Sequence, residues 1–261
     1  MMIDQSVEIL SNENVAENTF LLTFTSKEIA ADAKPGQFVM VQVSKGLEPL
    51  LRRPFSICAV EHEGVVTVLY KTVGRGTGLL SDLRPGRRMR VLGPLGKGFR
   101  LPDPSVFPVL VTGGIGAAPM VFFARSLGSR PFTWLAGYRT AAEIPPFPEL
   151  GVALENISIA TEDGSAGEEC LVTGLLESSL VSAREHTCVF SCGPSAMLKN
   201  VAAITERYQV PTQVSIETVM ACGIGACQGC SVPSSSVGGG YRQVCLDGPV
   251  FDSVDIDWSM L

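Results

Sequence analysis

Two patterns of apolar and polar residues divide the chain. Within residues 1–100, short runs rich in β-branched and aromatic side chains are separated by turn residues such as Pro35-Gly36 and Glu63-Gly64. Runs of this kind predict strands joined by tight turns. The predicted strands are residues 19–25, 37–43, 56–60, 65–71 and 88–92. Several short strands at this spacing predict a small antiparallel β-barrel over residues 1–100.

The pattern changes after a proline-rich connector at residues 101–107. Beyond it, fully apolar runs alternate with longer stretches of helical character. The predicted strands are residues 108–112, 132–136, 156–160 and 187–191, and the predicted helices are residues 118–127 and 195–208. Strands that alternate with helices predict a doubly wound, mostly parallel sheet. We assign residues 101–213 to this second domain and residues 214–261 to a small third domain.

Charge and composition exclude several classes of partner. The 261 residues carry a formal net charge of -6, which argues against nucleic acid and against an anionic membrane surface. The longest apolar run, residues 108–124, is interrupted by glycines and by Pro119, so it predicts a strand, a turn and a helix and no membrane span. The first fifteen residues lack the pattern of a signal peptide. We expect a cytoplasmic protein whose eight cysteines are ligands or core residues.

Four cysteines of the third domain have the spacing of metal ligands. Cys222, Cys227 and Cys230 follow the order C-x4-C-x2-C, and Cys245 comes after fourteen further residues. Plant-type ferredoxins hold a 2Fe–2S cluster with the same first three spacings, although their fourth cysteine lies much farther away. Four thiolates also suit zinc, but structural zinc sites usually use two separated pairs of cysteines. We therefore predict a 2Fe–2S cluster in a domain that is appended to the rest of the chain.

Three short segments of the predicted barrel point to a flavin. The segments are Arg53, Pro54, Phe55 and Ser56, then Tyr70, Lys71 and Thr72, then Gly76, Thr77 and Gly78. An arginine beside a rigid proline can bind a phosphate through two hydrogen bonds, although alone it is also an ordinary start of a basic strand. The glycines and Thr77 predict a short helix over residues 77–83, whose free N–H groups can bind a pyrophosphate.

Two glycine-containing turns of the second domain point to a dinucleotide. Gly113, Gly114 and Gly116 follow a predicted strand and precede a predicted helix, where they allow the backbone to approach a diphosphate. The third glycine of the usual fingerprint is replaced by Pro119. Cys192, Gly193 and Pro194 form the second turn at the carboxyl end of another strand, where open α/β sheets bind ligands. The alternative for Cys192 is a small buried residue at a strand end.

The chain offers no group for acid–base or nucleophilic catalysis in a recognisable arrangement. His62 and His186 are isolated in polar stretches, and Cys58, Cys170 and Cys188 have no pattern of partners. We therefore assign no acid–base role to any residue of the chain.

Together these segments resemble the ferredoxin–NADP reductase superfamily, and the whole chain resembles the electron-transfer subunits of type B dihydroorotate dehydrogenase. The resemblance implies a six-stranded FAD-binding barrel, a nucleotide-binding domain that takes NAD, and a 2Fe–2S domain with Cys222, Cys227, Cys230 and Cys245 as ligands. It implies an FMN-containing catalytic partner in a heterotetramer of two plus two subunits. Electrons from dihydroorotate would pass through FMN, the cluster and FAD to NAD, in pyrimidine biosynthesis. The cluster loop would then lie near the partner.

Two other functions remain open on these residues. The chain is similar to the small subunits of NADH-dependent ferredoxin:NADP oxidoreductase and of sulfide dehydrogenase. A zinc-stabilised binding module on a reductase fold without activity is the non-enzyme alternative. The choice between NAD and NADP is also open: NAD is the default from the resemblance, whereas Arg139 after a predicted strand could meet a 2′-phosphate.

Overall fold

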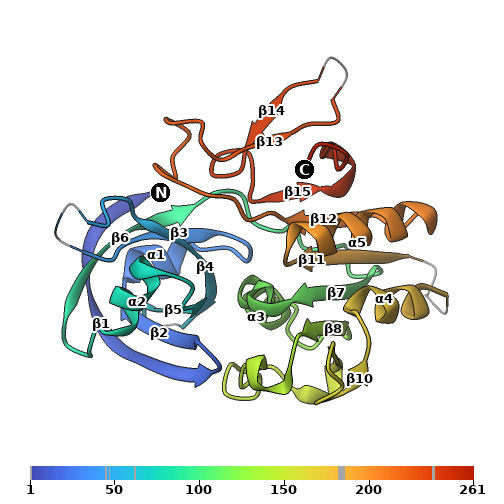
Figure 1. The fold of residues 1–261 in the computed structure, drawn as a ribbon, viewed down its shortest axis with the longest axis horizontal. Coiled ribbons are helices and arrows are strands. Elements are labelled where there is room, and N and C mark those ends of the chain that lie inside the picture. The colour runs from blue at the N-terminus through green and yellow to red at the C-terminus, as the bar shows by residue number, and fades with distance from the viewer. Residues whose placement is uncertain (1, 45, 47, 62, 182–185, 237–238) are drawn as a thin grey trace.

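A six-stranded barrel forms the N-terminal part of the computed structural model, which describes residues 2–44, 46, 48–61, 63–181, 186–236 and 239–261. The barrel is closed and antiparallel, with the strand order β1-β2-β5-β4-β3-β6 (Figure 1). Its elements are β1 (Ile3–Ala16), β2 (Thr19–Thr25), α1 (Lys27–Asp32), β3 (Phe38–Gln42), β4 (Arg53–Val60), β5 (Val65–Lys71), α2 (Arg75–Ser81) and β6 (Arg88–Leu95). The predicted barrel is thus confirmed, with β1 as a strand that the apolar pattern did not reveal.

Alternation along the strands fills the barrel with side chains. Ile9 of β1, Leu22 and Phe24 of β2, and Ile57 of β4 are fully buried inside it. Their neighbours along each strand face outward, as the two-residue period of a strand requires. Helix α1 begins at Ser26, whose hydroxyl accepts a hydrogen bond from the N–H of Ile29 at 3.1 Å.

The second domain is a seven-stranded sheet with the order β10-β9-β8-β7-β11-β12-β15. Its elements are β7 (Phe107–Gly113), η1 (Gly114–Gly116), α3 (Ala117–Ser126), β8 (Thr133–Tyr138), η2 (Ala141–Glu143), η3 (Leu154–Asn156), β9 (Ile157–Thr161), β10 (Glu168–Glu169), α4 (Val172–Val181), β11 (Thr187–Cys192), α5 (Ser195–Arg207) and β12 (Thr212–Ser215). All pairs within these strands are parallel. The order runs outward in both directions from β7 and β11, so the switch point of the sheet lies between these two strands.

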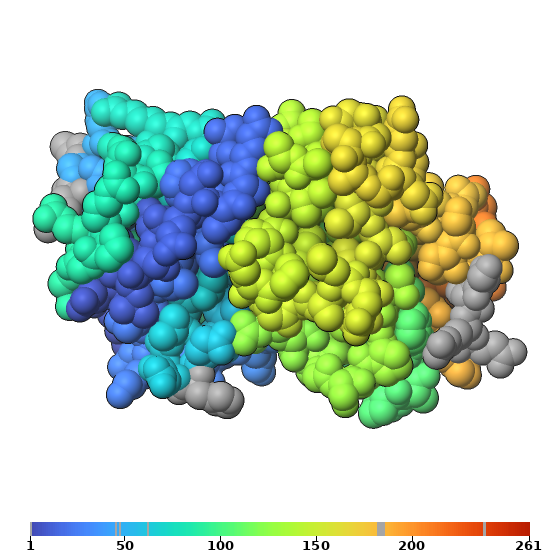
Figure 2. All heavy atoms as spheres, turned by 90° about the horizontal axis from the view of Figure 1, so that it is seen from below, coloured from blue at the N-terminus to red at the C-terminus, as the bar shows by residue number. Residues whose placement is uncertain are grey.

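Helices cover both faces of this sheet. Val109 and Val111 of β7 face α4 and α5, whereas Leu110 between them faces α3. Helix α3 also packs against β4 of the barrel, so it is shared by the two domains. Figure 2 shows the barrel and the second domain in direct contact along this side of the molecule. The doubly wound sheet is therefore confirmed, and α3 fixes its position relative to the barrel.

The C-terminal segment returns to the second sheet after it forms the cysteine loop. A two-stranded ribbon of β13 (Ser231–Pro233) and β14 (Tyr241–Gln243) follows the loop, and β15 (Val250–Asp252) then pairs antiparallel with β12, before η4 (Ser253–Asp255) (Figure 1). One core joins all three parts, because Met40 of the barrel, Val214 of β12 and Cys245 belong to the same buried cluster. No helix in the described ranges is long and apolar enough to cross a membrane.

Candidate functional site

A cavity of about 310 Å³ lies between the barrel and the segment that follows β12. The residues predicted for a flavin that line it are Arg53, Pro54, Phe55, Ser56, Tyr70, Lys71 and Thr77. The three other predicted residues, Thr72, Gly76 and Gly78, do not line the cavity. Thr72 and Gly76 support it from behind: the Thr72 hydroxyl donates to the carbonyl of Asn18 at 3.1 Å, and a side chain on Gly76 would come within 2.7 Å of Nε of Arg53.

Hydrogen bonds and packing hold the polar and aromatic walls of this cavity. Nη1 of Arg53 donates to the carbonyl of Leu51 at 2.6 Å, and the Thr77 hydroxyl accepts from the N–H of Val73 at 2.9 Å. The ring of Tyr70 lies 5.4 Å from that of Phe55, and burial raises the pKa of Tyr70 to about 12, so the hydroxyl stays neutral. The buried hydroxyl of Thr218 lines the cavity without a partner among the described residues, which fits a polar ligand.

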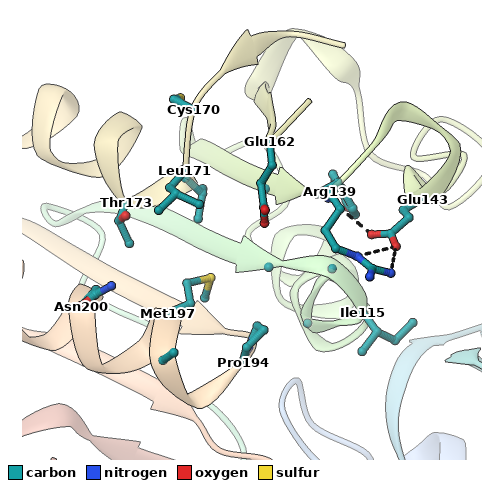
Figure 3. A pocket seen from close by; sticks show the side chains of 18 of the residues that line it. Ile115, Arg139, Glu143, Glu162, Cys170, Leu171, Thr173, Pro194, Met197 and Asn200 are labelled. Atoms are coloured by element: carbon teal, nitrogen blue, oxygen red, sulfur yellow. Dashed lines mark hydrogen bonds and ion pairs between the residues drawn. The ribbon is translucent and has the colours of Figure 1, made fainter. Parts of the chain in front are cut away.

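A second cavity of about 460 Å³ lies at the carboxyl ends of β7, β8 and β9, beside the first turn of α5 (Figure 3). Gly113, Gly114, Gly116, Gly193 and Pro194, all predicted for a dinucleotide, line it. Its position at the switch point of the sheet is the usual site of a nucleotide in open α/β folds.

The two predicted turns are in close contact, which explains why one of them has glycine at position 116. A side chain on Gly116 would approach the carbonyl oxygen of Cys192 to 2.2 Å, so only glycine lets the two backbones meet. Cys192 itself does not line either cavity and is fully buried. Burial raises the pKa of its thiol well above the usual range. Cys192 therefore packs behind the cavity wall with a neutral side chain.

Charged residues that the motifs did not include lie in the second cavity. Glu143 of η2 is buried and accepts hydrogen bonds from Nζ of Lys71 at 2.8 Å and from Nε of Arg139 at 3.0 Å (Figure 3). Burial alone would raise the pKa of Glu143, but the hydrogen bonds from Arg139 and Lys71 outweigh it and lower that pKa. Because Lys71 belongs to the barrel, this carboxylate ties the barrel to the second domain.

The two cavities are neighbours with common walls. Lys71, Ile115 and Glu217 line both of them. Glu217 is accessible from this shared space, and desolvation by the surrounding protein raises the pKa of its carboxyl. A ring system in the first cavity can therefore face a ring in the second.

Three of the four predicted metal ligands, Cys222, Cys227 and Cys230, follow Met220 of the flavin cavity within ten residues, and backbone contacts bring Cys245 to the same loop. Backbone N–H groups point at their sulfur atoms: that of Gly225 lies 3.1 Å from Sγ of Cys245, that of Ile224 lies 3.4 Å from Sγ of Cys222, and that of Gly229 lies 3.4 Å from Sγ of Cys227. Burial opposes ionisation of Cys222, but N–H groups such as that of Ile224 lower its pKa to about 6. Such donors stabilise thiolates, the form that binds iron.

The thiols of the cysteine loop differ in how readily they ionise. Burial and the neighbouring thiol of Cys230 raise the pKa of Cys245 to about 12. The four thiols of the loop therefore do not all ionise at neutral pH unless a cation binds them. Among the described residues, no three His, Cys, Asp or Glu side chains converge on one point that could hold a metal ion. The loop supplies four cysteines with backbone N–H groups at their sulfur atoms, which suits a 2Fe–2S cluster whose thiolates are distributed over two irons. The residues present fit the cluster.

Comparisons with known proteins agree with this geometry. Residues 217–257 match the iron-sulfur cluster binding domain of dihydroorotate dehydrogenase B, and residues 6–99 match the oxidoreductase FAD-binding domain. The electron transfer subunit of dihydroorotate dehydrogenase B (NAD(+)) from Desulforamulus reducens is 38% identical over 96% of this chain and 97% of its own. The same subunit from Geobacillus thermodenitrificans is 37% identical over 97% and 98%. The chain belongs to this family.

Solved structures place the family fold among the reductases. A chain of the NADH-dependent reduced ferredoxin–NADP oxidoreductase superposes with a TM-score of 0.84 at 28% identity, over 97% of this chain and 90% of its own. Phthalate dioxygenase reductase superposes with a TM-score of 0.64 at 19% identity, over 89% and 87%, which shows the shared fold alone. The predicted family, FAD and iron–sulfur cluster are thus confirmed, and the zinc-stabilised module is set aside.

Several functional candidates in this dehydrogenase subunit escaped the sequence motifs. Glu143, Glu162 and Glu217 all line the nucleotide cavity. One signal was present for Glu162, since it lies two residues after the predicted strand 156–160, whose carboxyl end faces the site. His62 and positions 237 and 238 of the loop after β13 lie outside the described residues.

Proposed function

We propose that this chain is the electron-transfer subunit of an NAD-linked dihydroorotate dehydrogenase. The observation that carries the proposal is continuity: the nucleotide cavity shares walls with the flavin cavity, and Met220 of the flavin cavity is two residues from Cys222. When bound, FAD would exchange a hydride with NAD and single electrons with the iron–sulfur cluster. A single chain thereby offers adjacent places for all three groups.

Each part of the chain has a separate task in this proposal. Arg53 binds phosphate at the flavin cavity, and Tyr70 with Phe55 forms a rigid wall beside the ring system. The turn Gly113–Gly116 takes the diphosphate of NAD, and the N–H groups of the cysteine loop stabilise the thiolates. None of these tasks moves a proton on dihydroorotate. We therefore assign dihydroorotate oxidation to a separate FMN-containing catalytic subunit, in a heterotetramer of two copies of each chain.

The partner would dock on the face around the cysteine loop. Three apolar side chains there are unusually exposed: Val219 at 85%, Leu246 at 54% and Ile224 at 44%. Exposed apolar residues gathered at one place often mark an interface.

Gly223 and Gly225 are less suitable for testing this face, because both have positive φ and a side chain on Gly223 would strike Met40. Ile224→Glu is therefore expected to weaken partner binding about tenfold, measured by calorimetry, while NADH still reduces the flavin.

A partner that binds Ile224→Glu with unchanged affinity would place the interface elsewhere. The control is Val254→Glu, because Val254 is also an exposed apolar side chain, at 79%, but belongs to η4, outside the cysteine loop. This control should leave partner affinity unchanged.

The second candidate is the small subunit of a ferredoxin–NADP oxidoreductase. It is favoured by the high TM-score of 0.84 to that enzyme, whereas the identity of 38% to a dihydroorotate dehydrogenase subunit favours the main proposal. Co-expression with each candidate partner distinguishes them. We expect an NAD-reducing complex with dihydroorotate as donor and about two irons, two sulfides and one FAD per chain. A complex that is inert to dihydroorotate but transfers electrons between NADH, NADPH and ferredoxin would overturn the proposal.

A further inference from the structure

A bulge in β1 directs the polar side chain of Asn12 toward the inside of the barrel. The register of β1 with β2 shifts between Ile9 and Ser11, where β1 has one extra residue. Because side chains alternate along a strand, an extra residue changes which of the following side chains face inward. Beyond the bulge, Asn12 pairs with Leu22, whose side chain is fully buried in the barrel. The Asn12 amide therefore lies on the inner side of β1.

The Asn12 amide joins β1 to two elements of the flavin site. Its Oδ1 accepts a hydrogen bond from the hydroxyl of Tyr70 at 3.0 Å. Its Nδ2 donates to the carbonyl of Leu80 at 2.8 Å and to that of Leu83 at 3.1 Å. Leu80 belongs to the last turn of α2, and Leu83 lies two residues after the helix ends at Ser81. Carbonyl groups at the end of a helix lack their usual partners within it, so the amide supplies donors there.

Helix α2 transmits this contact to the phosphate-binding side of the cavity. Val73, which precedes the helix, and Thr77 within it both line the flavin cavity. Gly76 packs directly against Arg53, since a side chain on Gly76 would come within 2.7 Å of Nε of Arg53. A shift of α2 toward Arg53 would therefore displace the guanidinium. The position of the helix thus decides where Arg53 lies.

The same amide fixes the aromatic wall of the cavity. The ring of Tyr70 stacks on that of Phe20 at 5.6 Å and lies 5.4 Å from that of Phe55. These two neighbours restrict the tilt of the ring, and the hydrogen bond to Asn12 holds the end of the side chain. One side chain therefore controls both the phosphate side and the aromatic side of the cavity.

We propose that Asn12 is a positioning residue of the flavin site, which holds α2 against Arg53 and Tyr70 in the cavity wall. The inference rests on the proposed role of Arg53 in binding a phosphate of FAD. Asn12 does not itself line the flavin cavity, so it acts through these neighbours. The guanidinium is a rigid planar fork, so a small displacement misaligns both of its hydrogen bonds to a phosphate. FAD then leaves the protein faster.

The test measures how fast FAD leaves the full chain with its bound cluster, from the rise in flavin fluorescence after dilution. Asn12→Leu removes all three hydrogen bonds at similar volume. We expect it to release FAD about tenfold faster, as misaligned hydrogen bonds to a charged group allow. Iron content should stay at about two per chain. Release at the wild-type rate would overturn the proposal.

A second substitution tests the contact with α2 without an apolar side chain in the barrel. Asn12→Asp keeps an oxygen that can accept from Tyr70, but it cannot donate to the carbonyls of Leu80 and Leu83. It should therefore accelerate FAD release about as much as Asn12→Leu, and it carries the test if Asn12→Leu does not fold. Wild-type release from Asn12→Asp would contradict the role of α2.

A double substitution separates positioning from a general loss of stability. Arg53→Gln should itself accelerate FAD release. Asn12→Leu added to Arg53→Gln should then accelerate it by less than about threefold, because both changes act on the same phosphate contact. Fully additive effects would show that Asn12 does not act through Arg53. Unchanged release in Arg53→Gln would instead overturn the proposed role of Arg53.

The matched control is Asn14→Leu, at another asparagine of β1. Asn14 is exposed, and its Nδ2 donates to the carbonyl of Thr19 at 3.3 Å, away from α2. Asn14→Leu should leave the rate of FAD release unchanged. Equal acceleration by Asn14→Leu and Asn12→Leu would show that loosening β1 is enough, and would overturn the specific role of Asn12.

Discussion

Cysteine shows how the local backbone decides the chemistry of a residue. Cys58 is fully buried in the core, and burial raises the pKa of its thiol to about 12. Cys222 belongs to a glycine-rich loop, and despite some burial the N–H groups of Ile224 and Cys227 lower the pKa of its thiol to about 6. The same residue type is thus a neutral core group in one place and a ready thiolate in another. The close spacing of Cys222 and its neighbouring cysteines predicted this difference, because several backbone N–H groups can approach a thiol only in a tight loop.

Removing one ligand should abolish the cluster. In Cys245→Ser, the hydroxyl is a poor iron ligand, so iron and sulfide content should fall from about two per chain to nearly none, while FAD remains bound. The measurement is iron and acid-labile sulfide analysis with visible absorbance. Cys188→Ser, at another buried cysteine, is the matched control and should keep its iron. Full iron content in Cys245→Ser would show that Cys245 is not a ligand.

At the scale of elements, the site depends on how β7, β11 and their turns meet. Apolar runs revealed these strands, because parallel strands buried on both faces are continuously apolar. The long strand β1 was not recognised, since many of its residues are polar and exposed on the outer barrel surface. The short strands β12 and β15 were also missed, because the pairing of Val214 with Phe251 joins distant parts of the chain. No local pattern encodes such a pairing.

Because the two turns are in contact, we expect alanine at Gly116 to destabilise the protein and alanine at Gly174 to stabilise it. Gly116→Ala would place a methyl group 2.2 Å from the carbonyl oxygen of Cys192, so we expect a loss of ~2 kcal/mol in unfolding free energy and weaker binding of NADH. Gly174→Ala in α4 meets open space and should gain ~0.5 kcal/mol, because glycine disfavours helices. Urea unfolding measures both. Equal effects at the two positions would contradict the turn contact.

The bridge from Lys71 through Glu143 to Arg139 predicts a pH-dependent link between the barrel and the second domain. Since the pKa of Glu143 is lowered in the folded protein from the ordinary 4.5, the bridge stabilises at neutral pH and is lost as the pH falls through the folded value. Glu143→Gln should therefore lower the unfolding free energy by ~2 kcal/mol at pH 7. The difference from wild type should shrink towards zero below pH 4.5. A difference that does not depend on pH would exclude the charge as its cause.

The bridge also marks the limit of what the sequence could reveal. Motifs identified the glycine turns, the Arg53 segment and the cysteines, because each depends on neighbours within a few residues. Glu143 and Glu217 become part of the site only when the barrel packs on the second sheet. Their roles depend on contacts across the domains, such as Lys71 with Glu143, which lie 72 residues apart. Local patterns do not contain that information.

At the scale of the molecule, three parts act as one body. Helix α3 packs against both the sheet and β4, and β15 returns the C-terminal segment to the sheet. The core that contains Met40, Val214 and Cys245 connects the barrel, the sheet and the cysteine loop. This common packing holds the nucleotide cavity, the flavin cavity and the cysteine loop at fixed separations. Fixed separations suit a protein whose task is to pass electrons along a short route.

The most direct test follows electrons through the reconstituted complex. Dihydroorotate is mixed anaerobically with the catalytic partner, NAD and either wild-type chain or Cys245→Ser, and NADH formation is followed by stopped-flow absorbance. We predict rapid NADH formation with the wild-type chain and at least a hundredfold slower formation with Cys245→Ser, although added NADH still reduces the FAD of this variant. NADH formation at the wild-type rate with Cys245→Ser would contradict the role of the cysteine loop in electron transfer.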